Sequence, residues 1–177
     1  MSGGLPTLTT ARLVLRPFNV ADAAGVQRFA GDKEVAATTI NLPHPYPDGA
    51  AEMWINSHAA LWEARERLTL AVTERAGGAL VGAIGLDLNA ANRRAELGYW
   101  IGRPYWNRGY ATEAGRAVVD YGFGPLGLHR IMARHLARNP ASGRVMQKLG
   151  MVEEGVLREH VLKWDVFENL VVYAVLA

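Results

Sequence analysis

The chain contains no cysteine among its 177 residues. That absence excludes a disulfide, a thiolate metal site and a cysteine nucleophile. An excess of one charge sign is also missing, because 19 lysine and arginine residues stand against 17 aspartate and glutamate residues and leave a formal charge of +2. A charge this small gives no reason to expect nucleic acid or a membrane surface as a partner.

Long apolar runs and a recognisable targeting segment are missing as well. No run approaches the ~20 apolar residues that a membrane-spanning helix needs. The N-terminal stretch from Met1 to Pro6 has neither the basic nor the apolar region of a signal peptide. The default expectation is therefore a cytoplasmic protein.

The composition that remains is typical of a globular protein. Hydrophobic residues make up 50% of the chain and charged residues 20%. A chain of 177 residues suits one domain with a sizeable core. We therefore predict a single domain over residues 1–177.

Apolar periodicity predicts the order of strands and helices. The predicted strands cover residues 12–16, 68–73, 79–88, 94–101, 130–136, 151–161 and 167–176. The predicted helices begin near Asn19, Asp48, Ala111 and Asn139 and end near Gly31, Arg65, Tyr121 and Gly150. Residues 38–48 form a proline-rich loop between them. This mixed order indicates an α+β protein with one mixed sheet.

The stretch from Trp106 to Ala114 joins a predicted strand to a predicted helix through a basic loop that contains a glycine. The first amides of a helix have no intrahelical partners and favour an anion. Gly109 lets a ligand oxygen approach the backbone closely, and Arg108 supplies a positive charge. These residues favour a phosphate site, although an ordinary strand-to-helix turn with an exposed arginine explains them equally well.

Two other patterns are interpreted as structural. Residues 122–127 spell GxGxxG, but they follow a helix and include Pro125, whereas a dinucleotide loop must follow a strand and open a helix. We interpret them as a helix-ending turn. His129 and His135 lie six residues apart without a cluster of carboxylates, so we expect no metal site.

With its neighbours, the stretch from 106 to 114 resembles the acetyl-CoA loop of the GNAT family of N-acetyltransferases. That family's pattern is Gln or Arg, two residues, Gly, one residue, then Gly or Ala. Gly109 and Ala111 match it, while Trp106 stands where Gln or Arg is usual. The segments 96–100 (ELGYW) and 139–142 (NPAS) are similar to the Rim-type branch, which acetylates N-termini of ribosomal proteins.

This resemblance covers residues 10–151 and implies a fold, a reaction and its partners. The fold is a mixed, mostly antiparallel sheet of about seven strands, with helices on both faces and a splayed central parallel pair. The reaction is acetyl transfer from acetyl-CoA to a primary amine, in the Rim-type branch a protein N-terminal α-amino group. An acetyltransferase for a small amine, such as an antibiotic, amino acid or polyamine, and a non-catalytic acyl-CoA-binding module stay open. The oligomeric state is open too, with a homodimer among the options.

The resemblance also assigns catalytic roles. Asn139 followed by Pro140 is by itself a good helix start. In the Rim-type branch the matching Asn bonds the pantetheine arm, and the serine that matches Ser142 is the proposed acid for the leaving thiolate. Glu96 is the candidate base, because GNAT histone acetyltransferases use a glutamate at the matching strand position; Arg94 is equally an ion-pair partner for it.

The remaining expectations concern acetyl-CoA. Backbone amides near Trp100 and Ile101 are expected to bind the oxyanion of the tetrahedral intermediate. Arg108 and the amides from Gly109 to Thr112 are expected to hold the pyrophosphate, and no metal is required. The full set of expected acetyl-CoA contacts is Trp100, Ile101, Arg103, Asn107, Arg108, Gly109, Tyr110, Ala111, Thr112, Asn139, Ser142 and Arg144.

Overall fold

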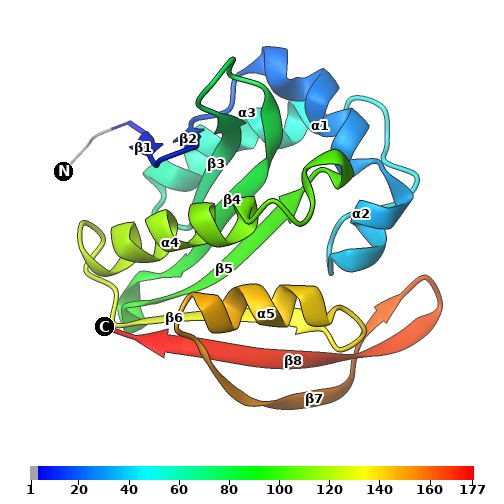
Figure 1. Ribbon diagram of the computed structural model, residues 1–177, viewed down its shortest axis with the longest axis vertical. Helices are drawn as coiled ribbons and strands as arrows, with labels where there is room; N and C mark the ends of the chain where they lie inside the picture. Colours follow the sequence, from blue (N-terminus) through cyan, green and yellow to red (C-terminus); the bar gives the residue numbers. More distant parts are fainter. Residues whose placement is uncertain (1–3) are drawn as a thin grey trace.

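The computed structural model describes residues 4–177. Met1, Ser2 and Gly3, the first half of the stretch in which no signal peptide was predicted, lie outside the described residues. The described strands form one sheet in the order β1-β2-β3-β4-β5-β6-β8-β7 (Figure 1). The strands are β1 (Leu8–Thr9), β2 (Leu13–Arg16), β3 (Arg67–Glu74), β4 (Leu80–Asn89), β5 (Arg94–Ile101), β6 (Arg130–Leu136), β7 (Val152–Lys163) and β8 (Val166–Leu176). The prediction of about seven strands missed only the two-residue strand β1.

The centre of the sheet contains a parallel pair that separates. β5 and β6 pair from Arg94 opposite Arg130 to Leu97 opposite Ala133. Beyond these residues β5 still pairs with β4 as far as Ile101, and β6 still pairs with β8 as far as Leu136. Each strand therefore continues on its outer side after the inner pairing has ended, which confirms the expected splay.

Helices cover both faces of the sheet, with α4 and α5 on one face and α3 on the other (Figure 1). The helices are α1 (Ala23–Ala30), α2 (Lys33–Thr38), α3 (Ala50–Glu63), α4 (Tyr110–Phe123) and α5 (Pro140–Lys148), with 3-10 turns at Val20–Asp22, Ala90–Asn92 and Arg103–Tyr105. Within residues 4–177, no helix has both the length and the apolar character needed to cross a membrane.

Three details of the predicted helices were wrong. Helix α3 ends at Glu63, close to the predicted Arg65, but its N-cap is Gly49, in the left-handed conformation, and not the expected Asp48. The helix expected after Asn19 starts with a 3-10 turn. Helix α2 was missed, because it has six residues, too few for a clear apolar stripe; Asp32 caps it by accepting a hydrogen bond from the Glu34 amide.

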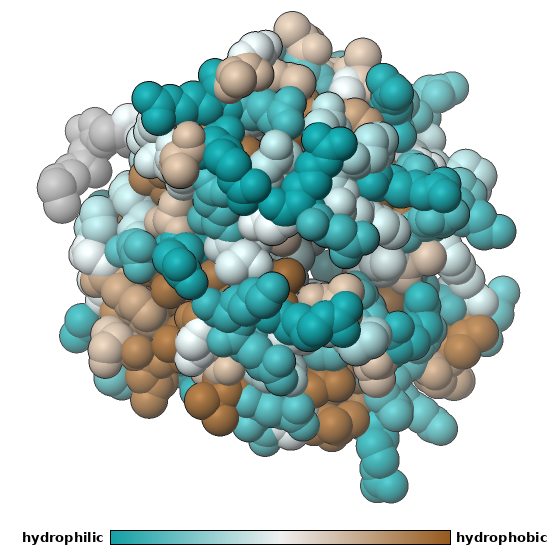
Figure 2. Space-filling model, in the orientation of Figure 1, coloured by the Kyte–Doolittle hydropathy of each residue, from teal (hydrophilic) through white to brown (hydrophobic). Residues whose placement is uncertain are grey.

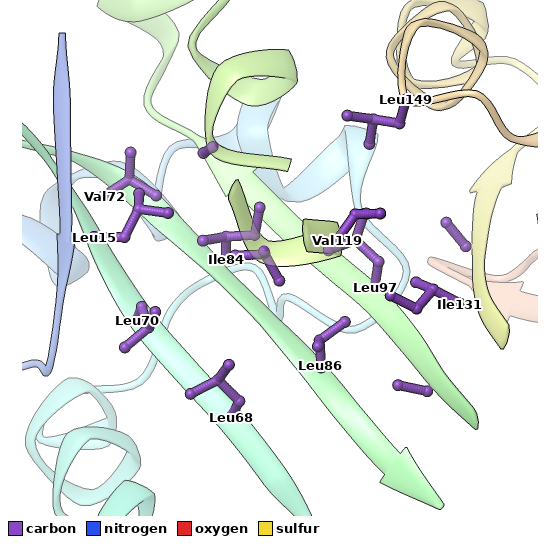
Figure 3. Packing of buried hydrophobic residues seen from close by; sticks show 14 of the residues in the cluster. Leu15, Leu68, Leu70, Val72, Ile84, Leu86, Leu97, Val119, Ile131 and Leu149 are labelled. Carbon is purple, nitrogen blue, oxygen red and sulfur yellow. The ribbon is translucent and has the colours of Figure 1, made fainter. Parts of the chain in front are cut away.

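Strand residues alternate between two apolar layers. Leu70, Ile84, Leu86 and Leu97, from three neighbouring strands, belong to one apolar layer with Val119 of α4 (Figure 3). The alternate positions of the same strands, among them Ala83 and Trp100, pack with α1 and α3 on the other face. The sheet is therefore buried on both faces near its centre, which fixes the direction of every side chain along β5.

Exposed apolar side chains gather on the last two strands. Val152, Leu162, Val166 and Phe167 are 71%, 59%, 57% and 64% exposed. Hydrophobic residues lie along the lower part of the view in Figure 2, where Figure 1 places β7 and β8. Strand β7 is also at the edge of the sheet. The free edge of β7, where apolar residues are mixed with charged ones such as Glu153, Arg158 and Glu159, is open to another chain.

Two glycines that face each other across β4 and β5 should respond differently to a methyl group. A Cβ on Gly85 would lie 2.1 Å from the carbonyl oxygen of Leu68, whereas a Cβ on Gly98 would meet no atom within 4 Å. We expect Gly85→Ala to lower the free energy of unfolding by about 1–3 kcal/mol. Gly98→Ala should stay within about 0.5 kcal/mol of the wild type. Urea denaturation of both variants measures this, and equal losses would contradict the packing argument.

His58 makes stability depend on pH. Its ring is 3% exposed, packs against Trp54 and Phe18, and neither ring nitrogen has a hydrogen-bond partner among the described residues. Burial, and to a lesser degree the charge of Arg67, lowers the pKa of His58 to about 4. Between that value and the ordinary histidine pKa of ~6.5, the unfolded chain binds more protons than the folded one.

We therefore expect the contribution of His58 to the free energy of unfolding to be complete above about pH 6.5 and to fall progressively toward about pH 4. His58→Phe should remove this dependence and keep the aromatic packing. Urea denaturation at several pH values in this window measures it. His160→Gln is the control, because His160 is exposed. An unchanged pH slope in His58→Phe would show that another group titrates.

Candidate active site

A cavity of about 520 Å³ lies where β5 and β6 separate. Glu96 and Trp100 line it on the face of the sheet that carries α3, and Tyr99 and Ser142 line it on the face that carries α5. Gly98, the first residue of β5 beyond the parallel pairing, lies between them. The cavity therefore passes through the sheet at the splay and is accessible to groups on both faces.

Four charged side chains cross the α3 face of the sheet in one row. Arg67, Asp87 and Glu96 are register partners on β3, β4 and β5. Arg67 forms an ion pair with Asp87. Arg134 of β6 donates from Nε and Nη2 to the two carboxylate oxygens of Glu96, at 2.8 and 3.0 Å. The alternative partner Arg94 was wrong: the register of β6 brings Arg134 to the same face as Glu96.

The order of charges in this row is positive, negative, negative, positive. Asp87 and Glu96 lie directly opposite each other, an arrangement of like charges that by itself destabilises a sheet. Each carboxylate is held by an arginine on its outer side, which offsets that repulsion. The row is neutral in sum, and both carboxylates stay partly accessible, with side-chain exposures of 55% for Asp87 and 30% for Glu96.

The loop between α2 and α3 forms the wall of the cavity opposite the sheet. Ile40, Leu42 and Tyr46 line the cavity from this loop. Lys163, which is 6% exposed, donates from Nζ to the carbonyl oxygens of Ile40 and Leu42 at 3.4 and 3.2 Å. Burial lowers the pKa of Lys163. These bonds to the backbone fasten a loop that its prolines already stiffen.

Helix α5 begins as its sequence predicts. Asn139 is the N-cap: its Oδ1 accepts a hydrogen bond from the Ser142 amide at 3.4 Å, and Pro140 occupies the first helical position. The other end of the same amide group donates from Nδ2 to the carbonyl oxygen of Thr38 at 3.1 Å. Asn139 therefore connects helix α5 to the end of α2, where the loop that covers the cavity begins.

Tyr99 contacts Ser142 across the gap between the strands. Its Oη lies 2.7 Å from Ser142 Oγ, a normal distance for a hydrogen bond between two hydroxyl groups. Burial raises the pKa of Tyr99 to about 12, so the phenol is neutral at ordinary pH. Sequence reasoning missed Tyr99, although the period of two along β5 places it on the same face as α5.

A second cavity, of about 570 Å³, lies beside the start of α4. Gly109 caps this helix in the left-handed conformation, with φ of +78°. Three basic side chains, Arg12, Arg116 and Lys148, line it together with Gly109, beside the carboxylates of Glu113 and Asp120. These three residues were also missed, because they come from the start of β2, the outer face of α4 and the end of α5, which are far apart in the sequence.

Arg12 is held in place beside Gly109. Its guanidinium forms an ion pair with Glu113 at 2.7 Å and donates from Nη1 to the carbonyl oxygen of Arg108 at 3.0 Å. It also lies 4.9 Å from the ring centre of Tyr110. The hydrogen bonds from Thr10, from the Arg12 amide and from its guanidinium hold the pKa of Glu113 below its ordinary value, against the effect of burial. The basic rim of this cavity is therefore preorganised.

The expected acetyl-CoA contacts fall into groups. Trp100 and Ser142 line the first cavity, and Gly109 and Thr112 line the second. Arg103 forms an ion pair with Glu34 at 3.0 Å. The other expected contacts line neither of these two cavities: Ile101, Arg103, Asn107, Arg108, Tyr110, Ala111, Asn139 and Arg144.

Trp106, the departure from the family pattern, has a structural role. Its indole Nε1 donates to the carbonyl oxygen of Ile101 at 2.7 Å, and its ring packs against both apolar layers. It therefore fixes the basic loop to the end of β5.

The GxGxxG segment is the helix-ending turn that the sequence predicts; of the two histidines, His129 is exposed and precedes β6, and His135 lines the first cavity. His135 is buried, its Nδ1 lies 2.8 Å from the Leu136 carbonyl oxygen, and its ring lies against Gly143. Helix α4 ends within the glycine segment, at Phe123. Across the described part of the chain, no three His, Cys, Asp or Glu side chains are placed to hold a metal ion.

Comparisons with known proteins agree on one family. A model described as an acetyltransferase (GNAT) domain matches residues 12–152. The chain is 36% identical over 157 residues to the uncharacterized N-acetyltransferase YoaA of Bacillus subtilis, covering 88% of each protein. It is 35% identical over 100 residues to the putative ribosomal N-acetyltransferase YdaF of B. subtilis, covering 56% of this chain and 55% of that protein.

One further relative is named for a small amine, and a solved structure matches nearly the whole chain. The chain is 27% identical over 150 residues to the spermidine N(1)-acetyltransferase of Vibrio cholerae, covering 84% of each protein. Among solved structures, a GNAT-family acetyltransferase from Bacillus anthracis superposes with a TM-score of 0.86 at 26% identity, covering 97% of this chain and 98% of the other.

Proposed function

Since the chain belongs to the GNAT family of acetyltransferases, we propose that it transfers the acetyl group of acetyl-CoA to the N-terminal α-amino group of a protein. One observation carries this proposal: the cavity at the splay joins the charged row on the α3 face to Ser142 on the α5 face. An acceptor on one side and a thioester on the other would meet in a single site. Holding both reactants together converts a bimolecular step into an effectively unimolecular one.

The second cavity suits the phosphate groups of acetyl-CoA. Gly109 leaves the first amides of α4 uncovered, and the helix start favours an anion. Arg12, Arg116 and Lys148 add positive charge around it. These three residues now rank above Asn107 and Arg144 as contacts for the phosphates. Arg103 ranks below these three as well, because it lines neither cavity. Asn139 keeps one amide hydrogen for the pantetheine arm, since Nδ2 has two and Thr38 takes one.

Acetyl-CoA supplies a thioester whose C–S bond breaks as the N–C bond to the amine forms. The amine must first lose a proton, and Glu96 is the proposed base, acting through water. Arg134 occupies one lone pair on each Glu96 oxygen, and a carboxylate has about four, so each oxygen can still accept a proton donor. Amides near Trp100 and Ile101 are proposed to bind the oxyanion, and Ser142 is proposed to act at the sulfur.

The charged row supports an α-amino acceptor over a polyamine. One ammonium group fits beside Asp87 and Glu96, and the carbonyl group next to an α-amino group suits the free N–H donors of the flanking arginines. A polyamine extended along the row would bring its further ammonium groups against Arg67 or Arg134. The likeness to a putative ribosomal N-acetyltransferase agrees with this choice, and the spermidine acetyltransferase is the counter-example.

A CoA-release assay with three acceptors tests the proposal. The acceptors are a peptide with a free N-terminus, the same peptide with its N-terminus acetylated, and spermidine. We propose turnover with the first alone. Turnover with spermidine alone would establish a small-amine acetyltransferase. Binding of acetyl-CoA without release in any arm would instead favour a non-catalytic acyl-CoA-binding module.

A single domain over residues 1–177 and a cytoplasmic location stay predictions. The oligomeric state stays open; the exposed apolar side chains of β7 and β8 offer a surface for a homodimer.

Gly109→Val should weaken acetyl-CoA binding while the protein stays folded. Valine at φ of +78° is strained, and its side chain would point toward the second cavity, where the only atom within 4 Å of the new Cβ is Arg12 Nη2 at 3.5 Å. We expect a loss of roughly 10–100-fold, the equivalent of ~1–3 kcal/mol for a group forced into a filled site. Calorimetry with acetyl-CoA, and with NAD as the unrelated nucleotide, measures it.

Gly127→Val is the matched control. Gly127 also has a positive φ, of +62°, and lies outside the residues that line the two cavities. Its variant should lose similar stability in a thermal melt and keep acetyl-CoA affinity. Wild-type affinity in Gly109→Val would reduce the loop to an ordinary turn.

Glu96→Gln should lower kcat at neutral pH and remove part of the rise of the rate with pH, because a positioned base contributes about 10²–10⁴-fold. Asp87→Asn is the matched control, since it removes the neighbouring carboxylate of the same row. The pH–rate profile of both variants is the measurement. A flattened profile in Asp87→Asn alone would move the base to Asp87, and two unchanged profiles would remove both carboxylates from that role.

A further inference from the structure

The contact between Tyr99 and Ser142 crosses the gap through which the cavity passes. Both side chains line the cavity, and both come from elements whose positions are fixed. Tyr99 lies on β5, which β4 holds in register as far as Ile101. Ser142 lies in the first turn of α5, held by the Asn139 cap. The 2.7 Å separation of the two hydroxyl oxygens is therefore a property of the folded chain before any substrate binds.

We propose that Tyr99 is a positioning residue for acetyl transfer: its hydroxyl donates to Ser142 Oγ and so directs the Ser142 hydroxyl hydrogen at the departing sulfur. This inference rests on the proposed function. The inference goes beyond that function by assigning a role in the reaction to Tyr99 of β5.

The direction of the hydrogen bond follows from counting protons. Each hydroxyl has one hydrogen, so one of the two must donate to the other. If Ser142 donated, the phenolic hydrogen would be left with the Ser142 carbonyl oxygen, which lies 3.5 Å away, at the limit of a hydrogen bond. If Tyr99 donates, its hydrogen has a partner at 2.7 Å and the hydrogen of Ser142 is free to face the cavity. The second arrangement gives the buried phenolic hydrogen the shorter of its two possible bonds and leaves the Ser142 hydrogen for a ligand in the cavity.

The step balances without any proton leaving either hydroxyl. The amine nitrogen bonds to the acetyl carbon, the C–S bond breaks, and its electron pair stays on sulfur. The proton of the amine leaves through water and Glu96. The thiolate then accepts a hydrogen bond from Ser142, which Tyr99 strengthens because hydrogen bonds in a chain polarise one another.

Full transfer of the phenolic proton to sulfur is unfavourable. Burial raises the pKa of Tyr99 to about 12. A thiol has an ordinary pKa of ~8.5, so the thiolate is a weaker base than the Tyr99 phenolate by roughly a thousandfold or more. The pair therefore serves to stabilise the thiolate as a hydrogen-bond donor rather than to act as a proton source.

The test compares CoA with desulfo-CoA, in which hydrogen replaces the thiol group. Calorimetry measures both affinities between about pH 7 and about pH 9.5, across the ordinary thiol pKa of ~8.5. In the wild type, the affinity ratio of CoA to desulfo-CoA should rise with pH as the thiolate forms. The part of this rise that depends on Ser142 should be about 10-fold or more, as expected for a hydrogen bond to a charged group, and Ser142→Ala should remove it. Tyr99→Phe should remove about 2–10-fold of it.

Two controls separate positioning from structure. Tyr121→Phe removes a phenol hydroxyl from α4 at a residue that lines neither cavity, and should keep the wild-type ratio. In the double variant Tyr99→Phe/Ser142→Ala the loss should equal that of Ser142→Ala alone, because Tyr99 acts only through Ser142.

The outcomes are distinct. A merely structural Tyr99 would weaken CoA and desulfo-CoA equally, leave the ratio unchanged and overturn the inference, as would additive losses in the double variant. If the wild type binds both ligands with a ratio that ignores pH, the inference fails and the proposed function stands. If it binds neither ligand, the proposed function fails first.

Discussion

The separation of β5 from β6 is the constraint on which the rest of the site depends. Their pairing ends at Leu97 and Ala133, while β4 and β8 continue to hold the outer sides of the two strands. Backbone groups on the inner edges then face a cavity in place of a strand, although buried backbone groups ordinarily need partners. A gap in the middle of a sheet persists only because each strand is fully supported from its other side. The sheet thereby provides an opening whose walls are rigid.

The period of two along a strand distributes chemistry to the two ends of this opening. On β5, Glu96 joins the charged row under the loop between α2 and α3, while Tyr99 reaches Ser142 on α5. Gly98 lies between them with no side chain to close the passage. A shift of register by one residue would send the carboxylate to the α5 face and the phenol to the acceptor side. Register, more than residue type, therefore determines which groups can meet.

Local patterns were readable from the sequence, and long-range partners were not. Strands 94–101 and 130–136 were predicted to the residue, and the Asn139–Pro140 start of α5 was recognised, because periodicity and capping depend on neighbours in the chain. The choice of Arg134 over Arg94 as the partner of Glu96 required the pairing of β6 with β5. The same limit hid the contact of Tyr99 and the basic rim of the second cavity, since these residues meet only after folding. Helix α2 was missed for the opposite reason, because six residues give too short a pattern.

Asn139 shows how closely the two sides of the opening are linked. Its Oδ1 accepts from the Ser142 amide and caps α5, while its Nδ2 donates to the carbonyl oxygen of Thr38, the last residue of α2, where the loop over the charged row begins. Removing this one amide would loosen the cap, which is worth about 1 kcal/mol, and release one end of the loop that Lys163 holds further along. A kinetic loss at Asn139 would thus combine three effects, of which contact with the pantetheine arm is only one. The geometry makes Tyr99 and Ser142 the more informative pair, because their hydrogen bond joins β5 to α5 beside the opening and caps neither a helix nor a loop.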